Sequence, residues 1–405
     1  MIWYIVAIIF LFFLVKINNT LSKKFFYPPL YLSFLWIILL LIHFYYRNFS
    51  IYTPFELSFK TLFYFSTIIA VFSFGGIIAK GVSKTSSDTQ YRFYFNKNII
   101  RAIFLINFII LVIYFNKVKE ITGTYTDLRM FRYYVSVIRV DIGIIKYCVV
   151  ITMFSSILAL ISYLNNSKSS KITIVFIILM SFITTFLTGA KGSIFFLILS
   201  CLGVYSAFRK INVKLLLKVV TAMFLTFIIL ATILKKATPD AYSTNREYSA
   251  IEKLEYFLYS YSALPLSAFD NFYNQPYEVT YGDILFRFPN AVLYKIGLKD
   301  SAPKELVEKY VSVPDSVNVF TAYYKMIKDF GVVYSILLMF IIGFVHSYFF
   351  LNNRKRFIYL IGFSTLLFPL TMTFFEENYF SILSTWIQVC LYTIIANQLV
   401  IIENE

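Results

Sequence analysis

Long apolar stretches alternate with short polar connections along almost the whole chain. Eleven stretches are each about long enough to cross a bilayer, and one long polar segment, Lys235 to about Asp329, interrupts the series. In lipid such a stretch can satisfy its backbone polar groups only as a helix. The predicted spans are Ile2–Val15, Leu30–Tyr46, Thr61–Ala79, Ile99–Phe115, Gly143–Leu164, Ile172–Leu187, Ile194–Phe208, Leu216–Leu234, Gly331–Leu351, Phe357–Phe374 and Tyr379–Ile402.

The composition agrees with this pattern. Hydrophobic residues make up 59% of the 405 residues and charged residues only 14%, which excludes a water-soluble globular domain. We therefore expect an all-α polytopic integral membrane protein with about 11 transmembrane helices and one large extracytoplasmic loop. The expected parts are helices 1–8 in residues 1–234, the loop in residues 235–330, and helices 9–11 in residues 331–405.

The basic residues predict the orientation of the chain. Alternate connections hold 17 of the 37 basic residues but only three of the 21 acidic ones, Asp88, Glu403 and Glu405. The net charge of +16 therefore divides into +14 on one side and +2 on the other. The positive-inside rule places the first set in the cytoplasm. We expect a multi-pass protein of the bacterial cytoplasmic membrane, with the N-terminus and the long loop outside and the C-terminus inside.

The remaining composition excludes several classes of site. The basic residues are dispersed over short turns, so topology and anionic lipid explain them, and we expect no nucleic-acid partner. Cys148, Cys201 and Cys390 lie within predicted spans without CxxC spacing, which indicates neither a disulfide framework nor a zinc site. We expect no metal and no cofactor. Of the two histidines, only His43 is predicted near the outer end of its span, His346 being near the cytoplasmic end.

A basic turn, Thr188–Ser193, separates the sixth and seventh predicted spans on the outer face. Gly189 and Gly192 flank Lys191, so the backbone can turn sharply and approach a ligand closely. Exposed amides and the Lys191 ammonium together would suit a phosphate group. A glycine hairpin with a lysine that reaches to the membrane interface is an equally open interpretation.

A second outer connection, Asn116 to Asp141, carries five basic residues. Arg129 and Arg132 are three residues apart, so on a helix they would share a face and could grip an anionic group as forks. The alternative is an interfacial helix over Met130 to Ile138 whose arginines touch lipid headgroups.

The long loop shows features of a surface that binds sugars. Its start, Ser243 through Leu258, has apolar residues at helical spacing beside charged ones, which predicts an amphipathic helix. Tyrosine and phenylalanine are dense from Tyr256 to Tyr277. Tyrosine rings can stack on sugar faces and hydrogen-bond hydroxyls, although tyrosines also populate membrane interfaces without a function.

Several of these segments resemble the bacterial O-antigen polymerases, the Wzy-type oligosaccharide repeat-unit polymerases. The resemblance covers about Thr188 to Leu351 and rests on the basic turn and on three further segments of the second half. Lys191 and Asn290 stand where family members often have arginine. The three segments are Arg287-Phe288-Pro289-Asn290, Asn318-Val319-Phe320-Thr321 and Asp329-Phe330-Gly331.

The resemblance implies a reaction at the outer face of the cytoplasmic membrane. A growing glycan is transferred from undecaprenyl diphosphate onto an incoming lipid-linked repeat unit, for lipopolysaccharide or another surface polysaccharide. The implied partners are the undecaprenyl diphosphate-linked oligosaccharide, membrane lipids and a chain-length regulator protein. The leaving diphosphate needs cations, and the acceptor hydroxyl needs a base. The candidates for diphosphate binding are Lys191, Arg129, Arg132, Arg246 and Arg287, and those for the catalytic base are Glu376, Glu377, Asp315, Asp283 and Glu247.

Three other functions remain open on the sequence. An O-antigen ligase shares the donor and the outer loop, but its relatives use a loop histidine, and residues 235–330 contain none. A lipid-linked oligosaccharide flippase or other transporter should carry charged residues at mid-membrane, and the predicted spans are nearly uncharged in their centres. A scaffold for a glycan-assembly complex would leave the basic turn without a role.

Overall fold

The structure, a computed structural model, describes residues 1–83, 90–125, 127–136, 138, 140–165, 170–233, 249–303 and 308–404. Every one of the eleven predicted spans overlaps a helix. Over the described ranges, nine helices are long and apolar enough to cross a membrane. The helices at the sixth and eleventh predicted spans, α7 and α15, each have 17 residues. The all-α polytopic architecture is confirmed, and the number of spans stays a prediction.

The chain forms two compact units that do not follow the linear division into residues 1–234, 235–330 and 331–405. That division concerns the membrane connections and stays a prediction. Unit 1 comprises Met1–Ser86, Arg246–Leu351 and Pro369–Ser384, and unit 2 comprises Ser87–Asn245, Asn352–Phe368 and Thr385–Glu405.

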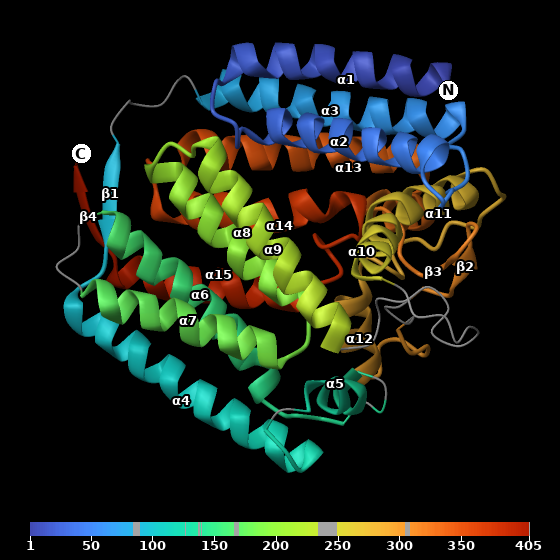
Figure 1. Cartoon of the computed structure of the whole chain (residues 1–405). Coiled ribbons are helices and arrows are strands. Elements are labelled where there is room, and N and C mark those ends of the chain that lie inside the picture. Colours follow the sequence, from blue (N-terminus) through green and yellow to red (C-terminus); the bar gives the residue numbers. More distant parts are fainter. Residues whose placement is uncertain are drawn as a thin grey trace. The chain divides into compact units, whose positions relative to one another are not determined.

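Unit 1 is built on four long helices that lie side by side, α1, α2, α3 and α13 (Figure 1). Short elements from the long polar segment pack on them. The elements of unit 1 are α1 Ile2–Leu21, α2 Pro28–Phe49, α3 Phe59–Ser83, α10 Ala250–Leu258, the π-helical turn η1 Tyr259–Ala263, α11 Leu264–Tyr273, α12 Arg287–Lys295, β2 Val311–Ser312, β3 Ser316–Val317, α13 Ala322–Asn352 and the 3₁₀ turn η2 Met372–Phe374.

Helices α3 and α13 approach each other at glycines. A Cβ built on Gly343 would lie 2.3 Å from the carbonyl oxygen of Phe72, and one on Gly75 would lie 2.4 Å from the carbonyl oxygen of Phe340. Both distances are far below a normal contact, so only glycine permits this separation of the backbones. Small residues at helix contacts are typical of membrane proteins, where close packing supplies the attraction between helices.

We expect Gly343→Ala to lower the free energy of unfolding by about 1–3 kcal/mol, because the added methyl group has to push two backbones apart. Gly81→Ala in α3 is the matched control, since a Cβ there has nothing within 4 Å. The measurement is thermal unfolding of the detergent-solubilised proteins. Equal melting temperatures for the two variants would contradict the close contact between α3 and α13.

The start of α13 differs from the rest of that helix. Gly331 has the non-helical angles φ 77° and ψ 176° and interrupts α13. The short helical segment Ala322–Phe330, which carries the charged residues, therefore precedes the long apolar part of the helix. Asp329 is fully buried, and its carboxylate accepts hydrogen bonds from the backbone N–H of Ile284 (3.1 Å) and Leu285 (2.6 Å). The long polar segment is therefore anchored to the start of α13, which agrees with the predicted beginning of the ninth span at Gly331.

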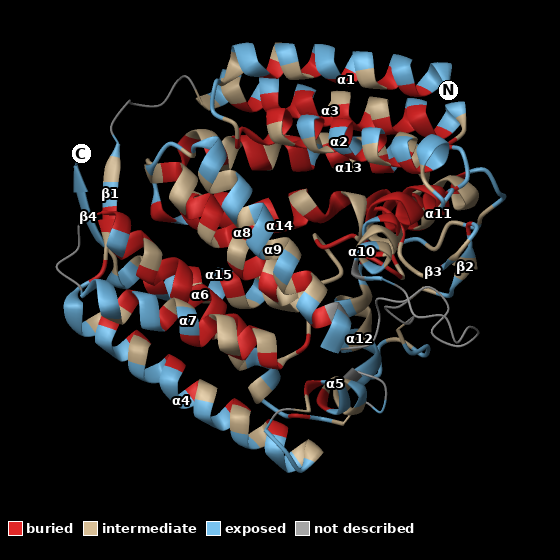
Figure 2. Ribbon diagram, in the orientation of Figure 1, coloured by how far each residue is buried: buried red, intermediate tan, exposed pale blue. Residues whose placement is uncertain are grey.

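The polar segment also folds over the ends of α1 and α2. A capping box, in which Ser249 and Glu252 bond each other's backbone N–H, begins α10 where the sequence predicts an amphipathic helix; residues 243–248 of that prediction lie outside the described range. α11 is buried along most of its length (red in Figure 2). Buried His43 bonds Tyr4 through Nδ1 and Ser267 through Nε2, both at 3.0 Å, so this histidine joins α1, α2 and α11.

Unit 2 contains a second group of packed helices. α6 contacts α4, α7 and α8, and α9 packs on α8. The elements of unit 2 are β1 Tyr91–Tyr94, α4 Lys97–Thr122, α5 Leu128–Ser136, α6 Ile145–Leu164, α7 Lys171–Leu187, α8 Lys191–Phe208, α9 Val213–Ile233 and β4 Ile401–Asn404. Helix α14, Phe357–Thr371, passes from unit 2 to unit 1 at Pro369, and α15, Leu383–Leu399, returns after Ser384.

Strands β1 and β4 pair antiparallel at one end of unit 2, with Arg92 opposite Glu403. The backbone of Arg354 accepts a hydrogen bond from the N–H of Tyr91 at 2.8 Å. The segments that hold β1, β4 and Arg354 all belong to the set predicted on the cytoplasmic side. Their proximity supports the prediction that alternate connections lie on the same side of the membrane. The eleventh predicted span, Tyr379–Ile402, is shortened at both ends by the start of α15 at Leu383 and by β4.

Candidate functional site

The basic turn of unit 2 connects α7 to α8. Gly189 has φ 61°, a left-handed conformation that favours glycine, and its N–H bonds the carbonyl of Phe186 at 2.9 Å. The Thr188 hydroxyl accepts the N–H of Ala190 at 3.0 Å. Lys191 then begins α8, at the positive end of an 18-residue helix. The sharp turn that the glycine predicted is therefore present.

Arg132 reaches this turn from α5. A Cβ built on Gly189 would lie 3.1 Å from Cδ and 3.5 Å from Cβ of Arg132, so the arginine stem packs directly on the glycine. The helix predicted for this connection is present as α5, with Arg129 exposed and Arg132 half-buried. The structure thus brings Arg132 to the turn that holds Lys191. No contact among the described residues brings Arg129 to the same turn.

The Lys191 side chain contacts an aromatic ring of unit 2. Its Nζ lies 4.0 Å from the centre of the Phe227 ring of α9, a cation–π contact that holds the ammonium in place. The other two diphosphate candidates are elsewhere. Arg287 is half-buried at the start of α12 in unit 1, and Arg246 lies outside the described residues.

Unit 1 contains a polar cavity that the sequence did not reveal. Its volume is about 140 Å³. Its walls come from the Asn318–Gly331 segment, from Glu308, and from the connection between η2 and α15. The lining residues are Glu308, Asn318, Val319, Phe320, Thr321, Tyr324, Lys325, Glu376 and Glu377.

An ion pair lies in the cavity wall. Nζ of Lys325 donates to Oε1 of Glu376 at 3.2 Å and to Oγ of Ser381 at 3.3 Å. The Lys325 side chain is 5% exposed and that of Glu376 is 39% exposed. The lysine is thus fixed inside the protein while the carboxylate keeps access to solvent and to the cavity. A carboxylate in this position can accept a proton from a bound hydroxyl.

Glu377 has a different role from its neighbour. It is fully buried, and its carboxylate accepts from the backbone N–H of Phe380 (2.7 Å) and Ser381 (2.8 Å) and from the Ser381 hydroxyl (2.7 Å). Burial raises the pKa of this carboxyl, and the bonds from Ser381 and Phe380 counteract part of the rise. Because both oxygens accept hydrogen bonds within this turn, Glu377 stabilises the cavity wall and the turn that precedes α15.

The other predicted bases lie away from the cavity lining. Asp283 pairs with Lys299 at 2.8 Å. Asp315 lies in the turn between β2 and β3, beside Tyr259; burial raises the pKa of Tyr259, and the Asp315 carboxylate raises it further. Glu247 lies outside the described residues. Glu376 is therefore the candidate that the geometry favours.

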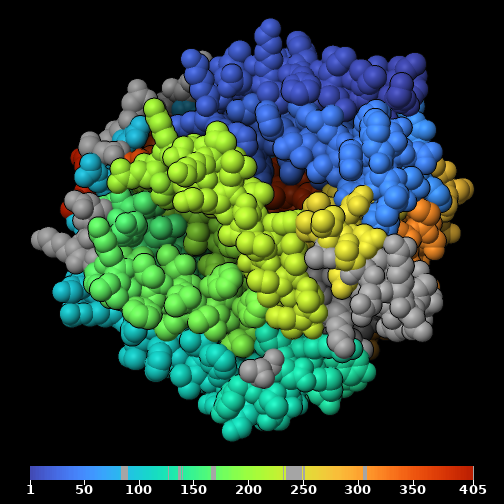
Figure 3. Space-filling model, viewed as in Figure 1, coloured from blue at the N-terminus to red at the C-terminus, as the bar shows by residue number. Residues whose placement is uncertain are grey.

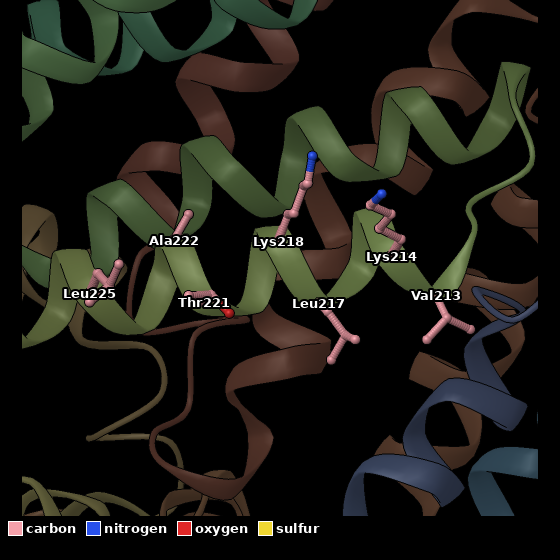
Figure 4. Close-up of a pocket in the computed structure, with 7 residues that line it drawn as sticks. All are labelled: Val213, Lys214, Leu217, Lys218, Thr221, Ala222 and Leu225. Carbon is pink, nitrogen blue, oxygen red and sulfur yellow. The ribbon is translucent and has the colours of Figure 1, made fainter.

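A groove of about 630 Å³ runs along α9, which lies at the surface of unit 2 (yellow-green in Figure 3). All its lining residues belong to that one helix, and they include Lys214 and Lys218 near one end (Figure 4). A shallow apolar face of a single spanning helix is what contact with lipid requires, so this groove adds nothing to the candidate site.

Comparison with known proteins adds no identification, because no family model, no curated protein and no solved structure matches this chain. The functional argument therefore rests on the two groups of residues above. One offers cations on a tight backbone turn, and the other offers a carboxylate and a buried ammonium around a small cavity.

Proposed function

We propose that this protein is a membrane glycosyltransferase that polymerises a surface polysaccharide such as O-antigen. It transfers a growing glycan from undecaprenyl diphosphate onto an incoming lipid-linked repeat unit at the outer face of the bacterial cytoplasmic membrane. In this proposal the long polar segment faces outward, the C-terminus is cytoplasmic, and a chain-length regulator is a partner.

The packing of Arg132 on Gly189 carries this proposal. It places a guanidinium-bearing side chain on the same glycine turn that presents Lys191 at the start of α8. Two cationic side chains and a helix N-terminus form a place where a diphosphate can be held without a metal ion. A plain hairpin with a lysine reaching to the interface would not need an arginine packed on its glycine.

The chemistry follows from these assignments. The oxygen of the acceptor hydroxyl forms a bond to the anomeric carbon of the donor glycan, and the bond from that carbon to the phosphate oxygen breaks. The electron pair stays on undecaprenyl diphosphate, whose charge needs cations; unit 2 offers Lys191 and Arg132 for this role. The hydroxyl proton passes to a base, for which unit 1 offers the carboxylate of Glu376.

The burial of charged groups favours an enzyme over a transporter. Within the described part of the chain, the buried lysine, aspartate and glutamate residues are Lys325, Asp329 and Glu377. The first two precede the break at Gly331, and the third follows η2, so none of these three lies in the long apolar part of a span. Buried His43 and His346 do lie within spans, where the first bonds Tyr4 and Ser267 and the second bonds Tyr379. A transporter coupled to ions should carry buried lysine, aspartate or glutamate residues at mid-membrane.

Deletion of the gene tests the proposal directly. We expect the electrophoretic ladder of the surface glycan to disappear while a single repeat unit remains attached to lipid A core. Loss of every repeat unit would instead indicate a flippase or a ligase, and an unchanged ladder would exclude all three functions. Restoring the gene in trans should restore the ladder.

A further inference from the structure

The cavity of unit 1 has the size of a single ring. Its volume of about 140 Å³ is close to that of an engineered cavity, roughly 150 Å³, that admits benzene. One bare six-membered ring therefore fits. A hexose has about twice as many non-hydrogen atoms as benzene, so an oligosaccharide could place only part of one residue inside.

The walls combine an aromatic surface with polar groups. Phe320 and Tyr324 both line the cavity, and their rings stack with centres 4.3 Å apart. The polar atoms come from Asn318 and from the pair of Lys325 and Glu376. An apolar ligand would bury the ion pair without replacing its contacts with water, which is costly. A polyhydroxylated ring matches both kinds of surface.

One lining group lacks a partner. Thr321 is 1% exposed, and within the described structure its hydroxyl oxygen has no hydrogen-bond partner. An unpaired buried hydroxyl lowers stability, and Thr321 alone among the described residues with such an atom lines this cavity, so a bound ligand group can complete it. A sugar hydroxyl can both donate and accept such a bond.

The charges of the cavity select against anions. Three carboxylates line it, those of Glu308, Glu376 and Glu377, and Lys325 is the one lysine among the lining residues. Lys328 pairs with Glu308 at 3.3 Å, which still leaves more negative than positive groups. A ligand that carries a carboxylate or a phosphate would be repelled, and an uncharged ring would not.

We propose that this cavity binds one uncharged sugar ring of the acceptor and that Thr321 contributes to its recognition. This inference rests on the proposed function, because it assigns the acceptor residue to the cavity that holds Glu376. Thr321 acts as a specificity-determining residue, and the excess of carboxylates excludes uronic acids from the same place.

The test measures sugar binding by saturation-transfer NMR on the full chain in detergent, without any lipid-linked donor. The probes are matched pairs, D-glucose with D-glucuronate and D-galactose with D-galacturonate, together with N-acetyl-D-glucosamine. At least one neutral sugar should bind, and each uronate should bind at least tenfold more weakly than its neutral counterpart. Absence of neutral-sugar binding, or equal binding of the uronates, would overturn the inference.

Thr321→Val removes the unpartnered hydroxyl at nearly constant volume. It should weaken neutral-sugar binding at least fivefold without lowering the melting temperature, a combination that a purely structural role cannot produce. Thr152→Val is the control, because that buried hydroxyl already bonds the carbonyl of Val149 at 2.9 Å and lies in unit 2. Half-exposed Asn318 provides a second variant, Asn318→Ala, with the same expected loss of binding.

The binding assay and the glycan ladder separate the two proposals. Normal neutral-sugar binding in a protein whose deletion leaves the ladder intact would refute polymerisation and the assignment of the bound ring to an acceptor, and would keep the binding of a neutral sugar in the cavity. A lost ladder on deletion, with neutral-sugar binding unchanged in Thr321→Val and Asn318→Ala, would keep the polymerase and refute the cavity assignment.

Discussion

Replacing Glu376 by glutamine should abolish glycan polymerisation while the protein stays folded in the membrane. The amide keeps the size of the side chain but cannot take the proton of the acceptor hydroxyl. General-base catalysis contributes about 10²–10⁴-fold to a rate, so we expect a loss of at least a hundredfold. The measurement is glycan chain length in cells, together with the amount of the variant in the membrane.

Two further substitutions, Asp283→Asn and Glu377→Gln, show whether the loss of polymer is specific to Glu376. Asp283→Asn is the matched control. The Asp283 carboxylate also pairs with a lysine and is about as exposed as that of Glu376, 40% against 39%, but it does not line the cavity. Asp283→Asn should leave the ladder unchanged. Glu377→Gln should lower the amount of protein, because an amide group would face backbone N–H donors. Equal losses of polymer in Glu376→Gln and Asp283→Asn would remove Glu376 from the mechanism.

The helices of this protein could be predicted from the sequence because lipid allows an apolar stretch few other structures. Some local structure was also readable: Gly189 adopts the left-handed conformation that a tight turn needs, and the amphipathic pattern predicted the helix α10, although not the cap that Ser249 and Glu252 form. In each of these cases the residues that determine the structure lie within a few positions of one another.

The candidate site depends on contacts that no local pattern contains. Lys325 and Glu376 are 51 positions apart, and their pairing follows from how α13 and the turn after η2 pack. The one available signal was the place of Lys325 within the Asn318–Gly331 segment, a polar stretch just before an apolar span. Arg132 was predicted as an anion ligand, but its contact with Gly189 required the placement of α5.

Lys191→Ala should shorten or abolish the glycan, and Lys191→Arg should retain much of it. The alanine variant loses a charge-assisted contact to the diphosphate, roughly 1.5–3 kcal/mol, which is about tenfold or more in donor binding. Arginine keeps the charge and can keep the cation–π contact with Phe227, although its fork has a different geometry. Donor binding to the purified protein and chain length in cells are the two measurements.

Arg132→Ala should act in the same direction as Lys191→Ala if both residues hold one anionic group at the turn. Exposed Lys253 and Lys309 provide matched controls, since their replacement by alanine removes a positive charge without touching the turn. Membrane protein level has to be measured for every variant, because Lys191→Ala also removes the contact with Phe227. A ladder of normal length from Lys191→Ala and Arg132→Ala would leave the turn as a plain glycine hairpin. A loss of polymer that only follows a loss of protein would mean that the two cations stabilise unit 2 rather than bind the donor.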